Sequence, residues 1–203
     1  MAEVSLERPV EDATAPDDLD ASPVDKLVMI IRHAEKPLPD RPDAGVTELG
    51  EEDDKSLTVR GWQRAGALAC LFCSPPTPLH IPKSIVASAP VKQDGSGTRN
   101  LRPTQTISPL ALRLQIEPDT RFSKGQVDLA GPLIAMQGSP TLVCWQHESI
   151  PRLAAAIVKR GGVAPRLWDH EDYDSIWMLG YSASSARWVF MRARQGLLLG
   201  DKR

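Results

Sequence analysis

Three short runs of apolar residues along the chain have the length and composition of buried strands. Residues 27–31 and 141–145 are almost entirely apolar and rich in strand-forming residues, and residues 84–89 form a third run. Strands of a parallel sheet that helices cover on both faces have this composition. The runs therefore predict three strands in the core of the molecule.

Four other segments repeat apolar residues at helical spacing. We expect one helix after Thr58, which would cap its N-terminus, and another after Asn100, which Pro109 would kink or restart. Residues 129–137 predict a third helix, and Ser149 begins a fourth that a glycine pair ends. Strands and helices thus alternate along most of the chain.

The C-terminal part has a different pattern. Residues 174–179 and 187–192 predict two strands, which a turn at residues 180–182 would join into an antiparallel hairpin. Together with the alternation of strands and helices, this predicts an α/β fold, a three-layer α/β/α sandwich. Its mostly parallel sheet would be extended by antiparallel C-terminal strands.

Two segments lack hydrophobic periodicity. Residues 37–56 hold three prolines, two glycines and an acidic run, and predict a long surface loop. Residues 1–24 hold seven acidic residues and one arginine, with too little apolar surface to offset the entropy cost of ordering. In a chain of 203 residues we therefore expect an acidic, flexible N-terminal tail, residues 1–24, and a single domain, residues 25–203.

Composition limits the classes of partner and the cellular compartment that we expect for the protein. The net charge is -2, and outside the acidic tail the chain is only mildly basic, which argues against a nucleic-acid partner. No apolar stretch approaches the roughly 20 residues that cross a bilayer, so no membrane partner is expected. Three cysteines, an odd number, suit a reducing compartment. We therefore expect a cytoplasmic protein.

Polar residues follow the predicted strands at the points where ligands bind in α/β folds. Arg32 and His33 come directly after the first strand, His147 follows the strand at 141–145, and Arg102 begins the helix after the second strand. Guanidinium groups bind phosphate oxygens in a bidentate manner, and a neutral imidazole is a nucleophile near pH 7. This set of residues predicts a phosphate site.

These residues also resemble the motifs of a known family. Arg32-His33-Ala34-Glu35 after an apolar strand resembles the signature of the histidine phosphatase superfamily, also called phosphoglycerate mutase-like. Residues 57–65 resemble the helix after that signature, and residues 101–106 resemble the second-arginine motif. Residues 145–148 resemble the second-histidine motif, and residues 195–201 resemble an ending found in a small bacterial-type subgroup. The resemblance covers nearly all of the chain outside the tail.

The resemblance implies a metal-independent phosphomonoester hydrolase in residues 25–203. His33 would attack phosphorus and become phosphorylated, while Arg32, Arg102 and His147 hold the phosphoryl oxygens. Water would then hydrolyse the phosphohistidine. We expect no cofactor and no metal, a small phosphorylated substrate or a phosphoprotein as partner, and a site able to bind phosphate ion.

The general acid that protonates the leaving alcohol is open among three carboxylic acids. Glu148 is favoured because it adjoins His147, as the acid does in the acid-phosphatase branch of the family. Asp119 lies where the mutase branch places its acid, and Glu35 belongs to the signature itself.

Two other functions remain as alternatives. A phosphoglycerate mutase-type phosphotransferase is disfavoured by Lys36-Pro37-Leu38-Pro39, which replaces the continuation of the signature expected in that branch. A catalytically silent domain that only binds phosphoanions is the other alternative. It is disfavoured because both histidines and both arginines are present.

Overall fold

The computed structural model describes residues 24–40, 42–91, 95 and 99–201. The predicted acidic tail lies outside the described residues except for Val24. Near the start of the described residues, the backbone N–H of Asp25 donates to the carbonyl of Tyr181, at 2.9 Å.

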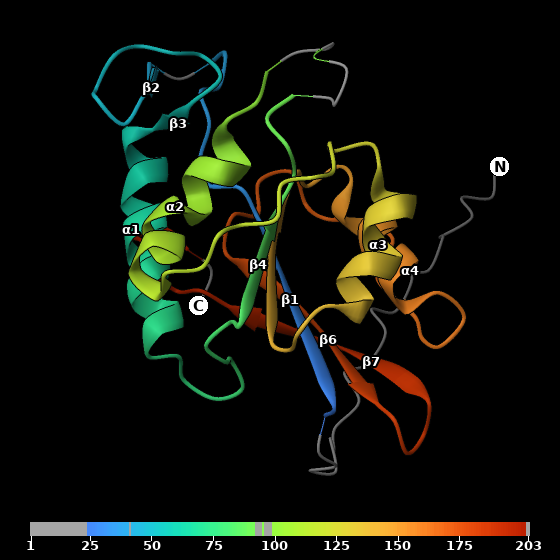
Figure 1. Cartoon of the computed structure of the whole chain (residues 1–203). Helices are drawn as coiled ribbons and strands as arrows, with labels where there is room; N and C mark the ends of the chain where they lie inside the picture. The colour runs from blue at the N-terminus through green and yellow to red at the C-terminus, as the bar shows by residue number, and fades with distance from the viewer. Residues whose placement is uncertain (1–23, 41, 92–94, 96–98, 202–203) are drawn as a thin grey trace, which may run out of the picture.

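A five-stranded mixed sheet forms the centre of the molecule (Figure 1). The first three strands across the sheet are parallel to one another, and each of the last two is antiparallel to the strand before it. In spatial order they are β4 (Ser84–Ala87), β5 (Thr141–Trp145), β1 (Lys26–Arg32), β6 (Ser175–Ser182) and β7 (Arg187–Arg194).

Two pairs of helices cover the two faces of the sheet. One face carries α1 (Val59–Cys73) and α2 (Arg102–Leu114), and the other carries α3 (Val127–Met136) and α4 (Ile150–Val158) (Figure 1). Strand β1 supplies both layers of core. Leu27, Met29 and Ile31 pack with α1 and α2, whereas Val28 and Ile30 pack with α3 and α4. This alternation explains why the run is apolar throughout and confirms the predicted three-layer α/β fold.

The predicted loop at residues 37–56 contains a small sheet that the sequence does not predict. Strand β2 (Gly45–Val46) pairs antiparallel with β3 (Leu57–Thr58), and the indole N–H of Trp62 donates to the Val46 carbonyl at 2.9 Å. Strands of two residues are too short to show a hydrophobic period, so no pattern could indicate them.

The hairpin prediction was wrong in the position of its turn. Strand β6 continues through residues 180–182, and the turn lies at residues 183–186. Gly180 is not a turn residue: a Cβ there would lie 2.8 Å from the Val24 side chain. Glycine in a strand often marks such a close approach.

Three helices also differ from expectation in where they begin or end. Helix α2 begins at Arg102, whose N–H donates to Asn100 Oδ1 at 3.2 Å, and it continues through Pro109. Helix α3 begins at Val127 and ends at Met136. Helix α4 ends at Val158, before the glycine pair, because Lys159 adopts a positive φ of 48°.

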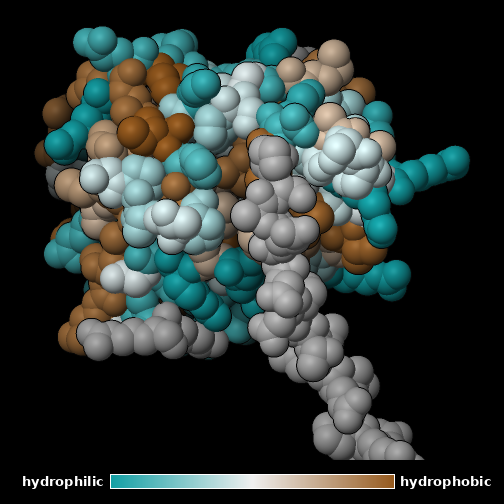
Figure 2. All heavy atoms as spheres, turned by 90° about the horizontal axis from the view of Figure 1, so that it is seen from below, coloured by the Kyte–Doolittle hydropathy of each residue, from teal (hydrophilic) through white to brown (hydrophobic). Residues whose placement is uncertain are grey.

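Among the described residues, no helix is both long and apolar enough to cross a bilayer. On the face seen in Figure 2, hydrophobic residues form separate patches among hydrophilic ones.

Candidate active site

The parallel pairing of β1 with β5 places the predicted site residues at one edge of the sheet. Arg32 is in register with Trp145, and the backbone N–H of His33 donates to the Trp145 carbonyl at 3.0 Å. Both strands end there, so His33 and His147 follow neighbouring strands at the same edge. The sequence predicted this juxtaposition from the two apolar runs.

His33 is held as a neutral imidazole with one ring nitrogen occupied. Its side chain is buried, and Nδ1 lies 2.8 Å from the carbonyl oxygen of Ala34. A carbonyl only accepts, so Nδ1 carries the proton and Nε2 keeps its lone pair. Burial lowers the pKa of His33 to about 3, and the charges of Arg32, Arg102 and Lys36 act in the same direction. The imidazole is therefore unprotonated near pH 7.

The loop after His33 is fastened to the start of α2 by Thr106. The hydroxyl of Thr106 accepts from the Ala34 N–H at 2.8 Å and donates to the Arg102 carbonyl at 2.7 Å. In the sequence, Thr106 belongs to the segment that resembles the second-arginine motif, where no role is indicated for it. The structure shows that it connects the two motifs.

Arg32 is almost completely buried and is fixed by the segment before β6. Its Nη2 donates to the Tyr173 hydroxyl at 3.0 Å, its Nη1 donates to the His170 carbonyl, and its guanidinium lies 3.7 Å from the centre of the Tyr173 ring. Its Nε has no hydrogen-bond partner among the described residues. Burial lowers its pKa below the usual value, but arginine stays charged in proteins, so Nε remains a cationic donor for an anion.

Arg102 points toward the loop before β3. Its Nε donates to the Ser56 carbonyl at 3.2 Å, and its Nη2 donates to the Asp54 carbonyl. The same guanidinium is near enough to His33 to help lower the pKa of that imidazole. The structure thus brings Arg102 toward the site and fixes it with two of its five N–H groups.

His147 and Glu148 lie next to each other on the loop between β5 and α4. His147 Nδ1 is 3.2 Å from Glu148 Oε2, without hydrogen-bond geometry, and burial followed by the charge of Arg32 lowers the pKa of His147. Burial alone would raise the pKa of Glu148. Its own backbone N–H and Lys124, whose Nζ lies 3.1 Å from Oε1, outweigh burial and hold this pKa below 4.5.

Lys36 is a cationic neighbour that the sequence did not indicate as a site residue. Burial lowers its pKa, and the charges of Arg102 and Arg32 lower it further. It also interacts with Glu148 and contributes to the low pKa of His33. No spacing rule marks a lysine four residues after the strand, so only the fold shows that Lys36 lies near the site.

The other two candidate acids are bound elsewhere. Glu35 accepts from Arg64 through both of its oxygens, at 2.8 to 3.1 Å, and Arg60 Nε lies 3.3 Å from it. Asp119 lies beside β4, where its carboxylate accepts from Arg121 and Gln137 at 2.7 to 2.9 Å. None of these contacts joins Glu35 or Asp119 to His33.

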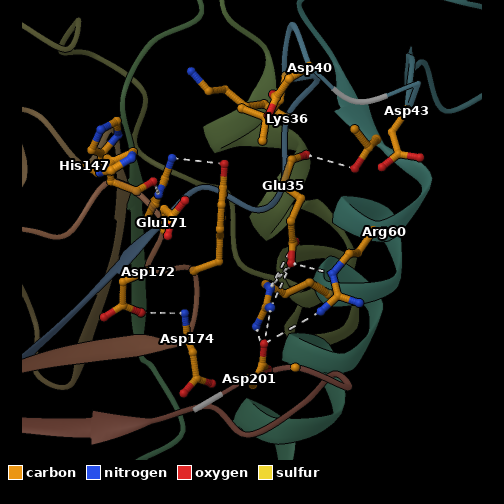
Figure 3. Close-up of a pocket in the computed structure, with 17 residues that line it drawn as sticks. Glu35, Lys36, Asp40, Asp43, Arg60, His147, Glu171, Asp172, Asp174 and Asp201 are labelled. Atoms are coloured by element: carbon orange, nitrogen blue, oxygen red, sulfur yellow. Dashed lines mark hydrogen bonds and ion pairs between the residues drawn. The ribbon is translucent and has the colours of Figure 1, made fainter.

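A pocket of about 580 Å³ adjoins this edge of the sheet (Figure 3). Arg32 and His147 line it, together with Lys36 and Tyr173, whereas His33, Arg102 and Glu148 are not part of its wall. Within the described part of the chain, no group of three or more His, Cys, Asp or Glu residues is placed to hold a metal ion.

Comparison with known proteins relates this geometry to solved structures. No protein-family model matches the sequence. No curated protein matches it either. The structure of the protein histidine phosphatase SixA complexed with tungstate superposes with a TM-score of 0.50 at 17% identity, covering 83% of this chain and 97% of that one.

Two other solved structures match at lower similarity. One is a phosphoserine phosphatase mutant from Entamoeba histolytica with phosphoserine, with a TM-score of 0.49, 12% identity, and 85% and 98% coverage. The other is a mycobacterial glucosyl-3-phosphoglycerate phosphatase complexed with VO3, with a TM-score of 0.46, 14% identity, and 82% and 97% coverage.

The structural similarity to SixA extends over most of both chains, and at 17% sequence identity it shows a shared fold. It agrees with the order of strands and helices that the sequence predicts. The chain therefore shares the α/β fold of the protein histidine phosphatase SixA.

Proposed function

We propose that the protein is a phosphatase of the histidine phosphatase superfamily, a metal-independent phosphomonoester hydrolase that works through a phosphohistidine on His33. The observation that carries the proposal is the state of His33. Its ring is buried and neutral, its Nδ1 is tied to the Ala34 carbonyl, and Arg32, Arg102 and Lys36 lie near it. A free Nε2 beside cationic donors is what attack on a phosphate ester requires.

In the first step, Nε2 of His33 forms a bond to phosphorus as the ester P–O bond breaks. Arg32, Arg102 and His147 hold the phosphoryl oxygens, whose negative charge is spread in the transition state. Arg32 contributes its unpartnered Nε. Lys36 adds positive charge at the same edge.

The leaving alkoxide takes a proton from Glu148. In the second step, water attacks phosphorus, the P–N bond breaks, and Glu148 takes the proton from water. Free phosphate leaves, and His33 regains its lone pair. Glu148 is favoured over Glu35 and Asp119 because its carboxylate interacts with both Arg32 and Lys36. Glu35 also interacts with Arg32 but is held by hydrogen bonds from Arg64, and Asp119 is held by Arg121.

The substrate would be a small phosphorylated molecule or a phosphoprotein, and the catalytic unit would be residues 25–203. SixA, which has the same fold, is solved with tungstate, an oxyanion with the shape of phosphate. This supports a phosphate-binding site here.

The proposal is tested by hydrolysis of an aryl phosphate in the presence of EDTA. We expect wild-type activity to survive EDTA, to vanish in His33→Ala, and to persist in His80→Ala, because His80 is an exposed histidine outside the site. Activity that EDTA abolishes, or that His33→Ala retains, would overturn the mechanism. Phosphate binding by a wild-type protein that hydrolyses nothing would favour the silent phosphoanion-binding domain.

A further inference from the structure

The pocket next to Arg32 has more acidic than basic groups in its wall. Four cationic side chains line it, and three of them are arginines. Seven carboxylates line it as well: Glu35, Asp40, Asp43, Glu171, Asp172, Asp174 and Asp201 (Figure 3). A wall that only had to hold a phosphate would not need this excess of negative charge.

Some of these carboxylates are neutralised within the protein. Glu35 and Asp201 share Arg64, at 2.8 and 2.7 Å. Asp172 accepts from Ser175 at 2.6 Å and lies 3.4 Å from Arg194. These contacts partly neutralise Glu35, Asp172 and Asp201.

Three carboxylates have no such partner. The side chains of Asp40, Asp43 and Glu171 are exposed, and none forms a hydrogen bond or ion pair with another described residue. In Figure 3 they come from two different loops on separate sides of the pocket. Their negative charge is therefore available to a ligand.

Three buried polar atoms in the wall lack hydrogen-bond partners among the described residues: Arg32 Nε, His147 Nδ1 and Asp174 Oδ2. The two on Arg32 and Asp174 belong to groups of opposite charge. Arg32 is 1% exposed and Asp174 is 4% exposed, yet Arg32 Nε and Asp174 Oδ2 have no hydrogen bond to any described residue. Among the described residues, Arg194 Nη1 forms an ion pair with Oδ2 at 3.7 Å, which is beyond hydrogen-bond distance. Leaving such groups unsatisfied is destabilising, and a ligand with an anionic and a cationic end would supply the missing partners.

Burial and the nearby carboxylate of Asp201 raise the pKa of Asp174, although the Gly196 N–H opposes them. A bound cation would favour the ionised form of this carboxylate. A positively charged ligand group would therefore be stabilised by the buried carboxylate of Asp174 and by the exposed carboxylates of the two loops.

We propose that this pocket binds the leaving group of the substrate, and that the preferred substrates are small phosphate esters whose leaving group carries a protonated amine or a guanidinium. The inference rests on the proposed function, because Arg32 would connect the phosphoryl group to the pocket. The volume of about 580 Å³ suits a small molecule, since ligand pockets span roughly 300–1,000 Å³.

The test compares aminoalkyl phosphates with alkyl phosphates of the same chain length. In the wild type we expect kcat/KM to be about tenfold higher for the amino ester at the best chain length, and the ratio to fall as salt screens the charges. Equal kcat/KM values for the two esters at every length would overturn the subsite.

Charge-neutral variants locate the effect. In the triple variant Asp40→Asn, Asp43→Asn, Glu171→Gln, the ratio for the two esters should fall to about 1. A matched control removes the same charge from exposed residues that do not line the pocket, through Glu48→Gln, Glu51→Gln and Glu52→Gln. The control should keep the wild-type ratio.

A preference that persists in the pocket variant, or that falls equally in the control, would overturn the inference. Aryl phosphate serves as the reference substrate. If the wild type hydrolyses aryl phosphate but shows no preference for amino esters, only the subsite is wrong. If it hydrolyses none of these esters, the proposed function is wrong and the subsite falls with it.

Discussion

Gly61, in the first turn of α1, is where the helix touches the loop that carries His33. A Cβ at this position would lie 2.5 Å from the carbonyl oxygen and 3.2 Å from the nitrogen of Glu35. The loop has little room to retreat, because the Glu35 carbonyl accepts from the Thr58 N–H at 3.0 Å and Ala34 is bonded to Thr106. Glycine is therefore required here for close packing.

Gly61→Ala should impair both stability and turnover. The new Cβ would be about 0.9 Å closer to the Glu35 oxygen than an ordinary contact of 3.4 Å. Overpacking of this kind costs typically ~1–3 kcal/mol of unfolding free energy. A shift of catalytic groups approaching ~1 Å lowers the rate about 10²-fold, so we expect a loss of that order in kcat for an aryl phosphate.

Gly66→Ala is the matched control in the same helix. Gly66 is exposed, and a Cβ there would meet nothing within 4 Å. Alanine is a better helix former than glycine, so this variant should gain roughly 0.5–1 kcal/mol and keep its activity. Urea unfolding and aryl phosphate hydrolysis measure both effects. A Gly61→Ala protein as stable and as active as Gly66→Ala would refute the reasoning.

Three further predictions concern titratable groups. Glu148→Gln should lower kcat for an alkyl phosphate by roughly 10²–10⁴-fold and kcat for an aryl phosphate much less. The control variant Asp119→Asn should change neither rate. Equal losses on both esters would contradict the role of Glu148 as general acid. The pKa of His33, about 3, keeps the nucleophile neutral down to that pH, and Glu148 donates only while protonated. The pH–rate profile for alkyl phosphates should therefore fall as pH rises above the lowered pKa of Glu148, and a rise toward pH 8 would argue against these roles. Hydrogen bonds from Arg64 and nearby backbone N–H groups lower the pKa of Asp201 from 3.8 to about 2 despite its burial. The ionised carboxylate therefore contributes roughly 2 kcal/mol to the free energy of unfolding at pH values above 3.8, and this contribution is lost as pH falls toward 2. In urea unfolding, Asp201→Asn should thus be less stable than wild type near pH 7 and nearly equal to it near pH 2, and a deficit that does not change with pH would count against the ion pair.

The sequence predicts those parts of the fold that depend on local pattern. The apolar runs indicate β1, β4 and β5, because strands covered on both faces must be apolar throughout. The same runs place Arg32, His33 and His147 at strand ends, since a polar residue directly after a buried strand must lie at the sheet edge.

Features that depend on long-range contacts are not predictable in this way. Tyr173, which supports Arg32, is 141 residues away from it along the chain. Arg64 joins Glu35 to Asp201 across 29 and 137 residues, and an ion pair over such separations leaves no periodic signal. The position of Gly180 was misjudged for the same reason, because Val24 packs over it only in the folded chain.

The most direct test of the phosphohistidine mechanism is rapid-quench trapping of a radiolabelled phosphate ester on the protein. We predict a label on the wild type that is labile to acid and stable to base, that maps to the peptide containing His33, and that is absent from His33→Ala but present in His80→Ala. Steady turnover without any such label, or a label on another residue, would contradict a phosphohistidine on His33.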